Sequence, residues 1–175
     1  HMTLDYLFFY AEANIVCIII FVCLLWHDRR YRTRQEKQIW FDRTVIAHIL
    51  YFISDIGWAA VISGDLPRTR GLVIIFNFLN FMLLSLIAYG WFMYMAASEG
   101  MLLNKKKRYE RLILIHAVIS MLVMVIAYAI NPLYWIDRDG TLNDMYYPLM
   151  VTVPSLYVFS SSVISFRNAK KTDVK

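Results

Sequence analysis

Residues 71–101 form an apolar run that carries a single formal charge, Glu99. An α-helix needs about 20 apolar residues to cross the roughly 30 Å hydrocarbon core of a bilayer, and this run is longer than that. Inside lipid every backbone amide must find its hydrogen-bond partner within the protein, and a helix meets this requirement by itself. The run therefore predicts a membrane-spanning helix.

Four further runs of the same kind flank it, which predicts an all-α, integral membrane five-helix bundle. The predicted spans cover about 4–26, 39–63, 71–101, 112–131 and 147–166. Composition agrees, because 59% of the residues are hydrophobic and the mean hydropathy is +0.50, whereas a soluble domain carries more polar surface. We therefore expect one membrane domain over residues 3–167.

The two ends of the chain are interpreted separately. His1 and Met2 resemble the remnant of a tag followed by a start methionine. Residues 168–175 are rich in charge and follow the fifth run without a Gly or Pro. We expect them to begin a cytoplasmic linker to an output domain that this sequence does not contain.

Basic residues gather on alternate connections between the predicted spans. The segments after the first, third and fifth spans hold Arg29, Arg30, Arg32, Arg34, Lys37, Lys105, Lys106, Lys107, Arg108, Arg111, Arg167, Lys170, Lys171 and Lys175. The opposite side holds only Arg68, Arg70 and Arg138. The positive-inside rule then places the N-terminus outside and the C-terminus inside. The same distribution accounts for the net charge of +5, so we expect no nucleic-acid partner.

Helix geometry places polar side chains from all five spans in one layer near the outer face. The candidate ligand-binding residues are Glu12, Asp55, Asn77, Asn80, Tyr128, Ser155 and Tyr157. Two carboxylates among amides and hydroxyls favour a cavity for a cationic or amine-bearing molecule, or for a proton. The alternative is that these side chains only hydrogen-bond between helices and enclose no cavity.

A second polar group lies at an inner depth and consists of His48, Tyr94 and His116. It could be a proton path or a polar core, and two histidines on different helices could also ligate a haem. The simpler alternative is that each histidine hydrogen-bonds a neighbouring group. Nucleophile, zinc, dithiol and phosphate-loop motifs are absent from the sequence. We expect no catalytic residue, no metal site and no cofactor.

Several motifs together resemble a known kind of membrane region. They are Asp55 in the second span, the segment 77–94 that ends in WFMY, the run Tyr134-Trp135-Ile136-Asp137, Gly140, and Tyr146-Tyr147-Pro148. Their order resembles the N-terminal multi-span sensor region of bacterial GGDEF proteins, the diguanylate cyclases, and similar regions that precede histidine kinase modules. The resemblance implies a multi-pass sensory input domain in the bacterial cytoplasmic membrane, and a homodimer. The GGDEF motif is not in this sequence, so the resemblance assigns no cyclase activity to this chain.

The function expected from the sequence is therefore that of a transmembrane sensory input domain. It would bind a small external or membrane-borne ligand within the lipid bilayer and transmit a conformational change through its fifth span to a cytoplasmic signalling module. The alternative is a small membrane transporter or a substrate-binding membrane subunit. A haem-bearing electron carrier is a third hypothesis.

Overall fold

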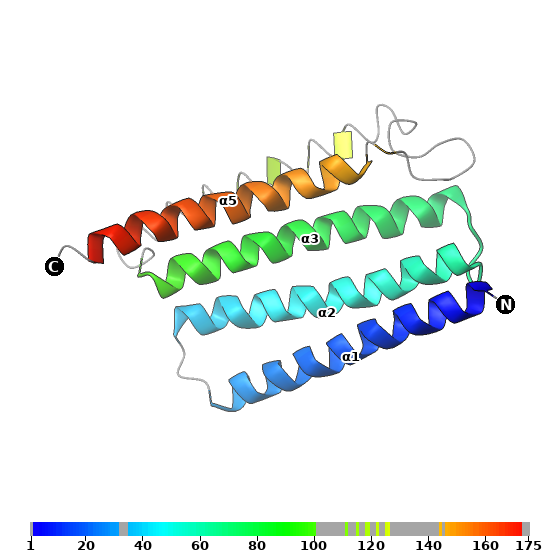
Figure 1. The fold of residues 1–175 in the computed structure, drawn as a ribbon, viewed down its shortest axis with the longest axis horizontal. Helices are drawn as coiled ribbons and strands as arrows, with labels where there is room; N and C mark the ends of the chain where they lie inside the picture. Colours follow the sequence, from blue (N-terminus) through cyan, green and yellow to red (C-terminus); the bar gives the residue numbers. More distant parts are fainter. Residues whose placement is uncertain are drawn as a thin grey trace.

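The computed structural model describes residues 2–31, 35–100, 111, 115, 118–119, 122, 125–126, 144 and 146–172. In these residues it contains four α-helices: α1 (Met2–Arg30), α2 (Glu36–Ser63), α3 (Arg70–Ser98) and α5 (Tyr146–Thr172) (Figure 1). Three of them contain segments long and apolar enough to cross a membrane, namely Leu7–Arg30, Glu36–Ser63 and Arg70–Ser98. The all-α fold is therefore confirmed, and the three candidate spans indicate a multi-pass membrane protein.

The structure gives three candidate spans in its described part, not the five that the sequence predicts. Most of the fourth predicted span, 112–131, lies outside the described residues, which include only 115, 118–119, 122 and 125–126 of it. The fifth, 147–166, lies within α5, which is not among the three candidates. Serines and the internal Pro154 make α5 the least apolar of the four helices.

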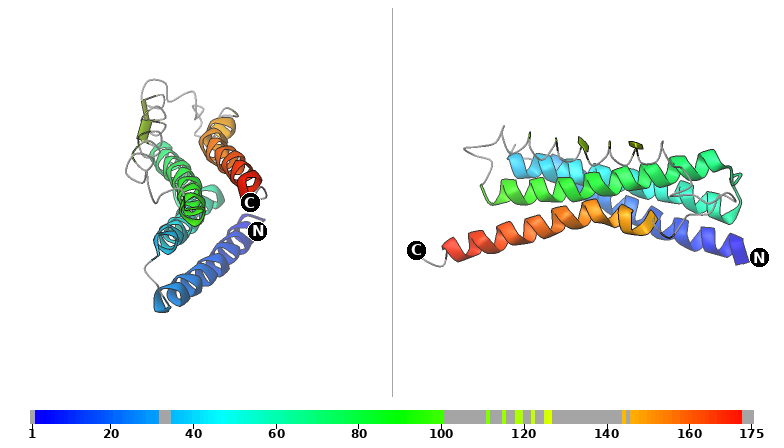
Figure 2. Two further views of the ribbon diagram at one scale, coloured as in Figure 1. Left: turned by 90° about the vertical axis from the view of Figure 1, so that its left-hand side faces the viewer. Right: turned by 90° about the horizontal axis from the view of Figure 1, so that it is seen from above.

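Figures 1 and 2 show that the helices lie side by side, and they show the direction in which each helix runs. α2 packs between α1 and α3, and α3 packs between α2 and α5. α1 and α2 are antiparallel, as are α2 and α3, whereas α3 and α5 run in the same direction. The N-terminus and the C-terminus consequently lie at opposite ends of the bundle.

A tight connection joins α2 to α3. Gly64 follows α2 with a φ of 90°, in the left-handed region that glycine adopts without steric cost. Thr69 then precedes α3, and its hydroxyl accepts a hydrogen bond of 3.4 Å from the backbone N–H of Leu72. Gly64 therefore ends α2, and Thr69 caps the start of α3.

The core is centred on the contact between α2 and α3. Val45, Val61, Val73, Phe81 and Met93 are fully buried there. α3 contains more buried residues than any other helix in the described ranges, and it packs against both α2 and α5. By contrast, α1 exposes many large apolar side chains. These include Phe8, Phe9, Ile15, Val16, Ile19, Ile20, Val22, Leu24 and Trp26. Such a surface is suited to lipid rather than to water.

Candidate functional site

A hydrogen-bonded polar network joins α1, α2 and α3. The hydroxyl of Tyr10 on α1 donates to Oδ2 of Asp55 on α2 over 2.7 Å. Nδ2 of Asn80 on α3 donates to Oδ1 of the same carboxylate over 3.4 Å. Asp55 is only 7% exposed and Asn80 only 4%. We call these three residues the Asp55 network.

The two contacts to the carboxylate differ in strength. A distance of 2.7 Å is ordinary for an O–H donor, whereas 3.4 Å is longer than the usual range of about 2.7–3.2 Å for an N–H donor. The carbonyl oxygen of Asn80, Oδ1, is buried and has no hydrogen-bond partner among the described residues. The network therefore contains a buried carboxylate and a buried amide oxygen whose hydrogen-bonding capacity is incompletely used.

The other outer residues predicted from the sequence lie in different surroundings. Asn77 is buried, and its Nδ2 donates to the carbonyl of Val73 on its own helix over 2.7 Å. Glu12 is exposed on α1, and the structure does not bring it to Asp55. Ser155 is exposed on α5, and Tyr128 lies outside the described residues.

Sequence reasoning missed two residues of α1. Tyr10 supplies the strongest donor to Asp55, and Asn14 is buried with its Nδ2 donating to the carbonyl of Tyr10 over 3.0 Å. The signal that could have found them is their spacing. Residues four apart share a helix face, so Tyr10 and Asn14 form a polar stripe that faces away from Glu12.

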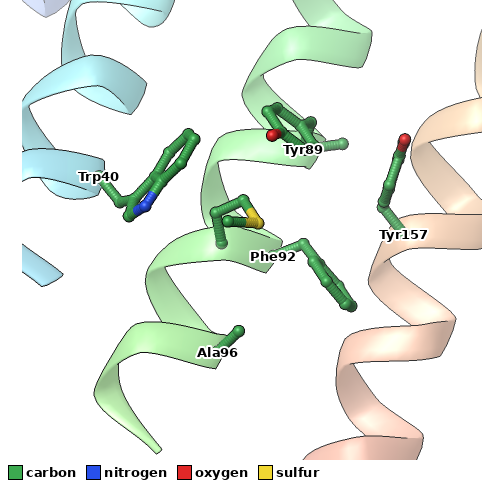
Figure 3. Packing of buried hydrophobic residues seen from close by; sticks show 7 residues of the cluster. Trp40, Tyr89, Phe92, Ala96 and Tyr157 are labelled. Carbon is green, nitrogen blue, oxygen red and sulfur yellow. The ribbon is translucent and has the colours of Figure 1, made fainter. Parts of the chain in front are cut away.

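Tyr157 belongs to a second cluster, the inner aromatic cluster, which consists of Trp40, Ala88, Tyr89, Phe92, Met93, Ala96 and Tyr157 (Figure 3). The ring of Tyr157 lies 6.0 Å from Tyr89 and 6.0 Å from Phe92, measured between centroids. Tyr89 is nine residues beyond Asn80, or about 13 Å along α3. The structure thus places Tyr157 in an apolar contact between α3 and α5 and not beside Asp55.

Of the inner polar group, His48 and Tyr94 lie in the described residues. Nδ1 of His48 lies 2.8 Å from the carbonyl oxygen of Thr44, and since a carbonyl only accepts, Nδ1 carries the proton. The imidazole also stacks on Phe21, with centroids 4.9 Å apart. Tyr94 packs edge-on against Trp91 at 5.6 Å.

The hypothesis of haem ligation needs His116, which lies outside the described residues, and a proton path from Asp55 toward His48 stays a prediction. In the part of the chain that the structure describes, no three His, Cys, Asp or Glu residues gather as metal ligands would. The contacts of His48 are those of a histidine bonded to its own helix.

Polar contacts also fix the opposite end of the bundle. Nε of Arg29 on α1 lies 3.7 Å from Oδ2 of Asp42 on α2. The hydroxyl of Ser165 on α5 donates to Oε1 of Glu99, the residue that follows α3, over 2.7 Å. The guanidinium carbon of Arg43 lies 4.8 Å from the ring centroid of Trp40. The first two contacts join neighbouring helices at the end where α3 and α5 finish, whereas the contact of Arg43 with Trp40 lies within α2.

Fold and site together define a class: a helical multi-pass membrane protein with a buried polar network near one end and an aromatic helix contact toward the other. Comparisons with protein-family models, with curated proteins and with solved structures find no match to this chain. Function must therefore be argued from the geometry of the site.

Proposed function

We propose that this chain is a membrane sensory domain in which the Asp55 network receives a small ligand and α5 transmits the response to a cytoplasmic signalling module. The resemblance to the sensor regions of GGDEF and histidine kinase proteins suggests this type of module. A ligand biases such a domain only if it prefers one helix arrangement over another. The network suits this role because it joins three helices through one carboxylate.

One observation carries the proposal: a single continuous helix, α3, contacts both the network and α5. Asn80 of α3 contacts Asp55, while Tyr89 and Phe92 of the same helix pack on Tyr157 of α5. At the end of α3, Glu99 accepts the hydrogen bond from Ser165 of α5. A shift or rotation of α3 at Asn80 would therefore move the surface against which α5 packs, and helix shifts of about 1–2 Å are typical of such transitions.

The finer membrane arrangement, with five spans and the N-terminus outside, is part of the same proposal. α3 and α5 run in the same direction, as the third and fifth of five alternating spans would. The termini at opposite ends of the described bundle also fit an odd number of crossings.

This topology predicts the accessibility of two exposed positions, Asp65 between α2 and α3 and Lys37 near the start of α2. In a chain with Cys17 and Cys23 replaced by Ala, a cysteine at Asp65 should react in intact cells with a membrane-impermeant maleimide. A cysteine at Lys37 should react only after the cells are permeabilised. The reverse pattern, or labelling of both positions in intact cells, would contradict the topology.

If the Asp55 network acts on α5, a substitution at Asp55 should change the distance between α3 and α5. Spin labels on Leu86→Cys and Val163→Cys, both exposed positions, would report the distance between α3 and α5 in nanodiscs. We expect Asp55→Asn to shift the distance by about 2 Å or to change the ratio of two distances, because it weakens the bond that orients Asn80. Pulsed electron paramagnetic resonance measures this directly.

The matched control is Glu12→Gln, which neutralises an exposed carboxylate on α1 and should leave the distance distribution unchanged. Asn80→Ala should act like Asp55→Asn, since it removes the α3 partner of the same carboxylate. Identical distributions in all four proteins would show that α5 does not respond to the network and would remove the basis of the proposal.

A further inference from the structure

The environment of Asp55 restricts what can bind to it. Asp55 is 7% exposed, and its carboxylate is contacted directly by side chains from the helices on either side of α2. An organic amine would have to displace Tyr10 or Asn80 to reach the carboxylate oxygens. A ligand of atomic size needs only a small rearrangement of these side chains.

The charge of Asp55 is also uncompensated by a basic residue in the described part of the chain. The ion pair found there joins Arg29 to Asp42, and the partners of Asp55 are two neutral groups. Burying a carboxylate without a counter-charge is costly, above all between membrane helices. A cation beside Asp55 would remove this cost.

Oxygen ligands for such a cation are close to the carboxylate. The amide of Asn80 approaches Oδ1 of Asp55 through a long contact of 3.4 Å, and its own Oδ1 is buried without a hydrogen-bond partner among the described residues. Turning this amide about its terminal bond would exchange its nitrogen and oxygen and direct the oxygen toward the carboxylate. The hydroxyl of Ser54, next to Asp55 on α2, is likewise buried and without a partner in the described ranges.

We propose that Asp55 and Asn80 form the core of a sodium-ion site between α2 and α3, closed by Tyr10 of α1. Carboxylate, amide and hydroxyl oxygens are the ligands that hard cations prefer, and one carboxylate balances one positive charge. A proton would neutralise Asp55 but would occupy a single acceptor, whereas a metal ion engages several oxygens at once. The ion would be the ligand of the proposed sensory function. The inference rests on that function only for its signalling consequence, because binding can be measured without it.

The test is the thermal unfolding of the full chain in nanodiscs at constant pH and ionic strength, with sodium chloride compared with choline chloride at about 0.15 M. A ligand that binds only the folded state raises the midpoint, and we expect sodium to raise it by about 2–4 °C. Asp55→Asn should abolish the difference between the two salts. Asn80→Ala should raise the sodium concentration at half effect by about tenfold or more, since a ligand oxygen is lost.

Glu12→Gln is the control, because it removes an exposed carboxylate of the same helix bundle and should keep the full sodium effect. Equal midpoints in sodium and choline for the unsubstituted chain would overturn the proposal. So would a sodium effect that survives Asp55→Asn, or stabilisation that follows only a lowering of pH in either salt. Where Asp55→Asn does not yield folded protein, Asn80→Ala decides the same question.

The two proposals fail in different ways. A sodium-dependent midpoint together with an unchanged α3–α5 distance would leave the ion site standing and would remove the sensory function. A changed α3–α5 distance in Asp55→Asn, without any effect of sodium on the midpoint, would support the sensory function and would remove the ion site.

Discussion

Tyr157→Ala is expected to detach α5 from α3 and to lower the free energy of unfolding by about 3 kcal/mol. Tyr157 is 6% exposed and is the one buried side chain in the part of α5 whose side chains the structure describes. Its ring lies 6.0 Å from the rings of both Tyr89 and Phe92, and alanine would leave that space empty (Figure 3). Thermal unfolding in nanodiscs measures the loss, and labels at Leu86 and Val163 should report a broader distance distribution.

The matched control for this change is Phe159→Ala on the same helix. Phe159 is 69% exposed, so truncating it removes an aromatic ring of similar size that makes no buried packing contact. We expect its unfolding free energy to stay within about 0.5 kcal/mol of the unsubstituted chain. If Tyr157→Ala and Phe159→Ala behave alike, the aromatic cluster does not attach α5 to the bundle and the proposed route of transmission is lost.

Gly90→Ala is expected to lower the free energy of unfolding by about 2 kcal/mol, because it separates α2 from α3. A Cβ atom built at Gly90 would overlap Oγ1 of Thr44 and would lie 3.1 Å from the Cβ of the same residue. Thr44 cannot easily turn away, since it is 1% exposed and its hydroxyl donates to the carbonyl of Trp40 over 2.7 Å. Small residues allow close approach of membrane helices, and Gly90 has this role here.

Two further variants isolate the cause of this effect. Gly71→Ala lies on the same helix, but a Cβ atom at that position meets nothing within 4 Å, so stability should be unchanged or slightly higher. Adding Thr44→Ala to Gly90→Ala removes Oγ1 and Cγ2, two of the three Thr44 atoms nearest to the new Cβ, and should restore part of the loss. Gly90→Ala with the stability of the original chain would mean that the two helices are farther apart than described.

The position of the helices could be predicted from the sequence alone. The apolar runs around 4–26, 39–63 and 71–101 correspond to α1, α2 and α3. In lipid, the backbone N–H and C=O groups of such a run must hydrogen-bond within the protein, and an α-helix satisfies all of them. The connection between α2 and α3 was also predictable, since Gly64 and Pro67 lie only three residues apart between two apolar runs, a combination typical of a turn. Asp55 and Asn80 were identified as neighbours in depth for the same reason: depth follows from counting residues along a helix.

Which side chains meet was decided only by the tertiary structure. Rotation about the axis of α1 brings Tyr10 to Asp55 and leaves Glu12 exposed, although both lie near the same depth. The position of α5 along α3 puts Tyr157 against Phe92 and far from the network. Rotation and relative height depend on packing between helices, such as the fit of Gly90 against Thr44, and such fits involve residues distant in the chain. In a bilayer, the apolar runs of the sequence are therefore enough to determine that helices form and where they end. Which faces of these helices touch is determined by the packing of their side chains.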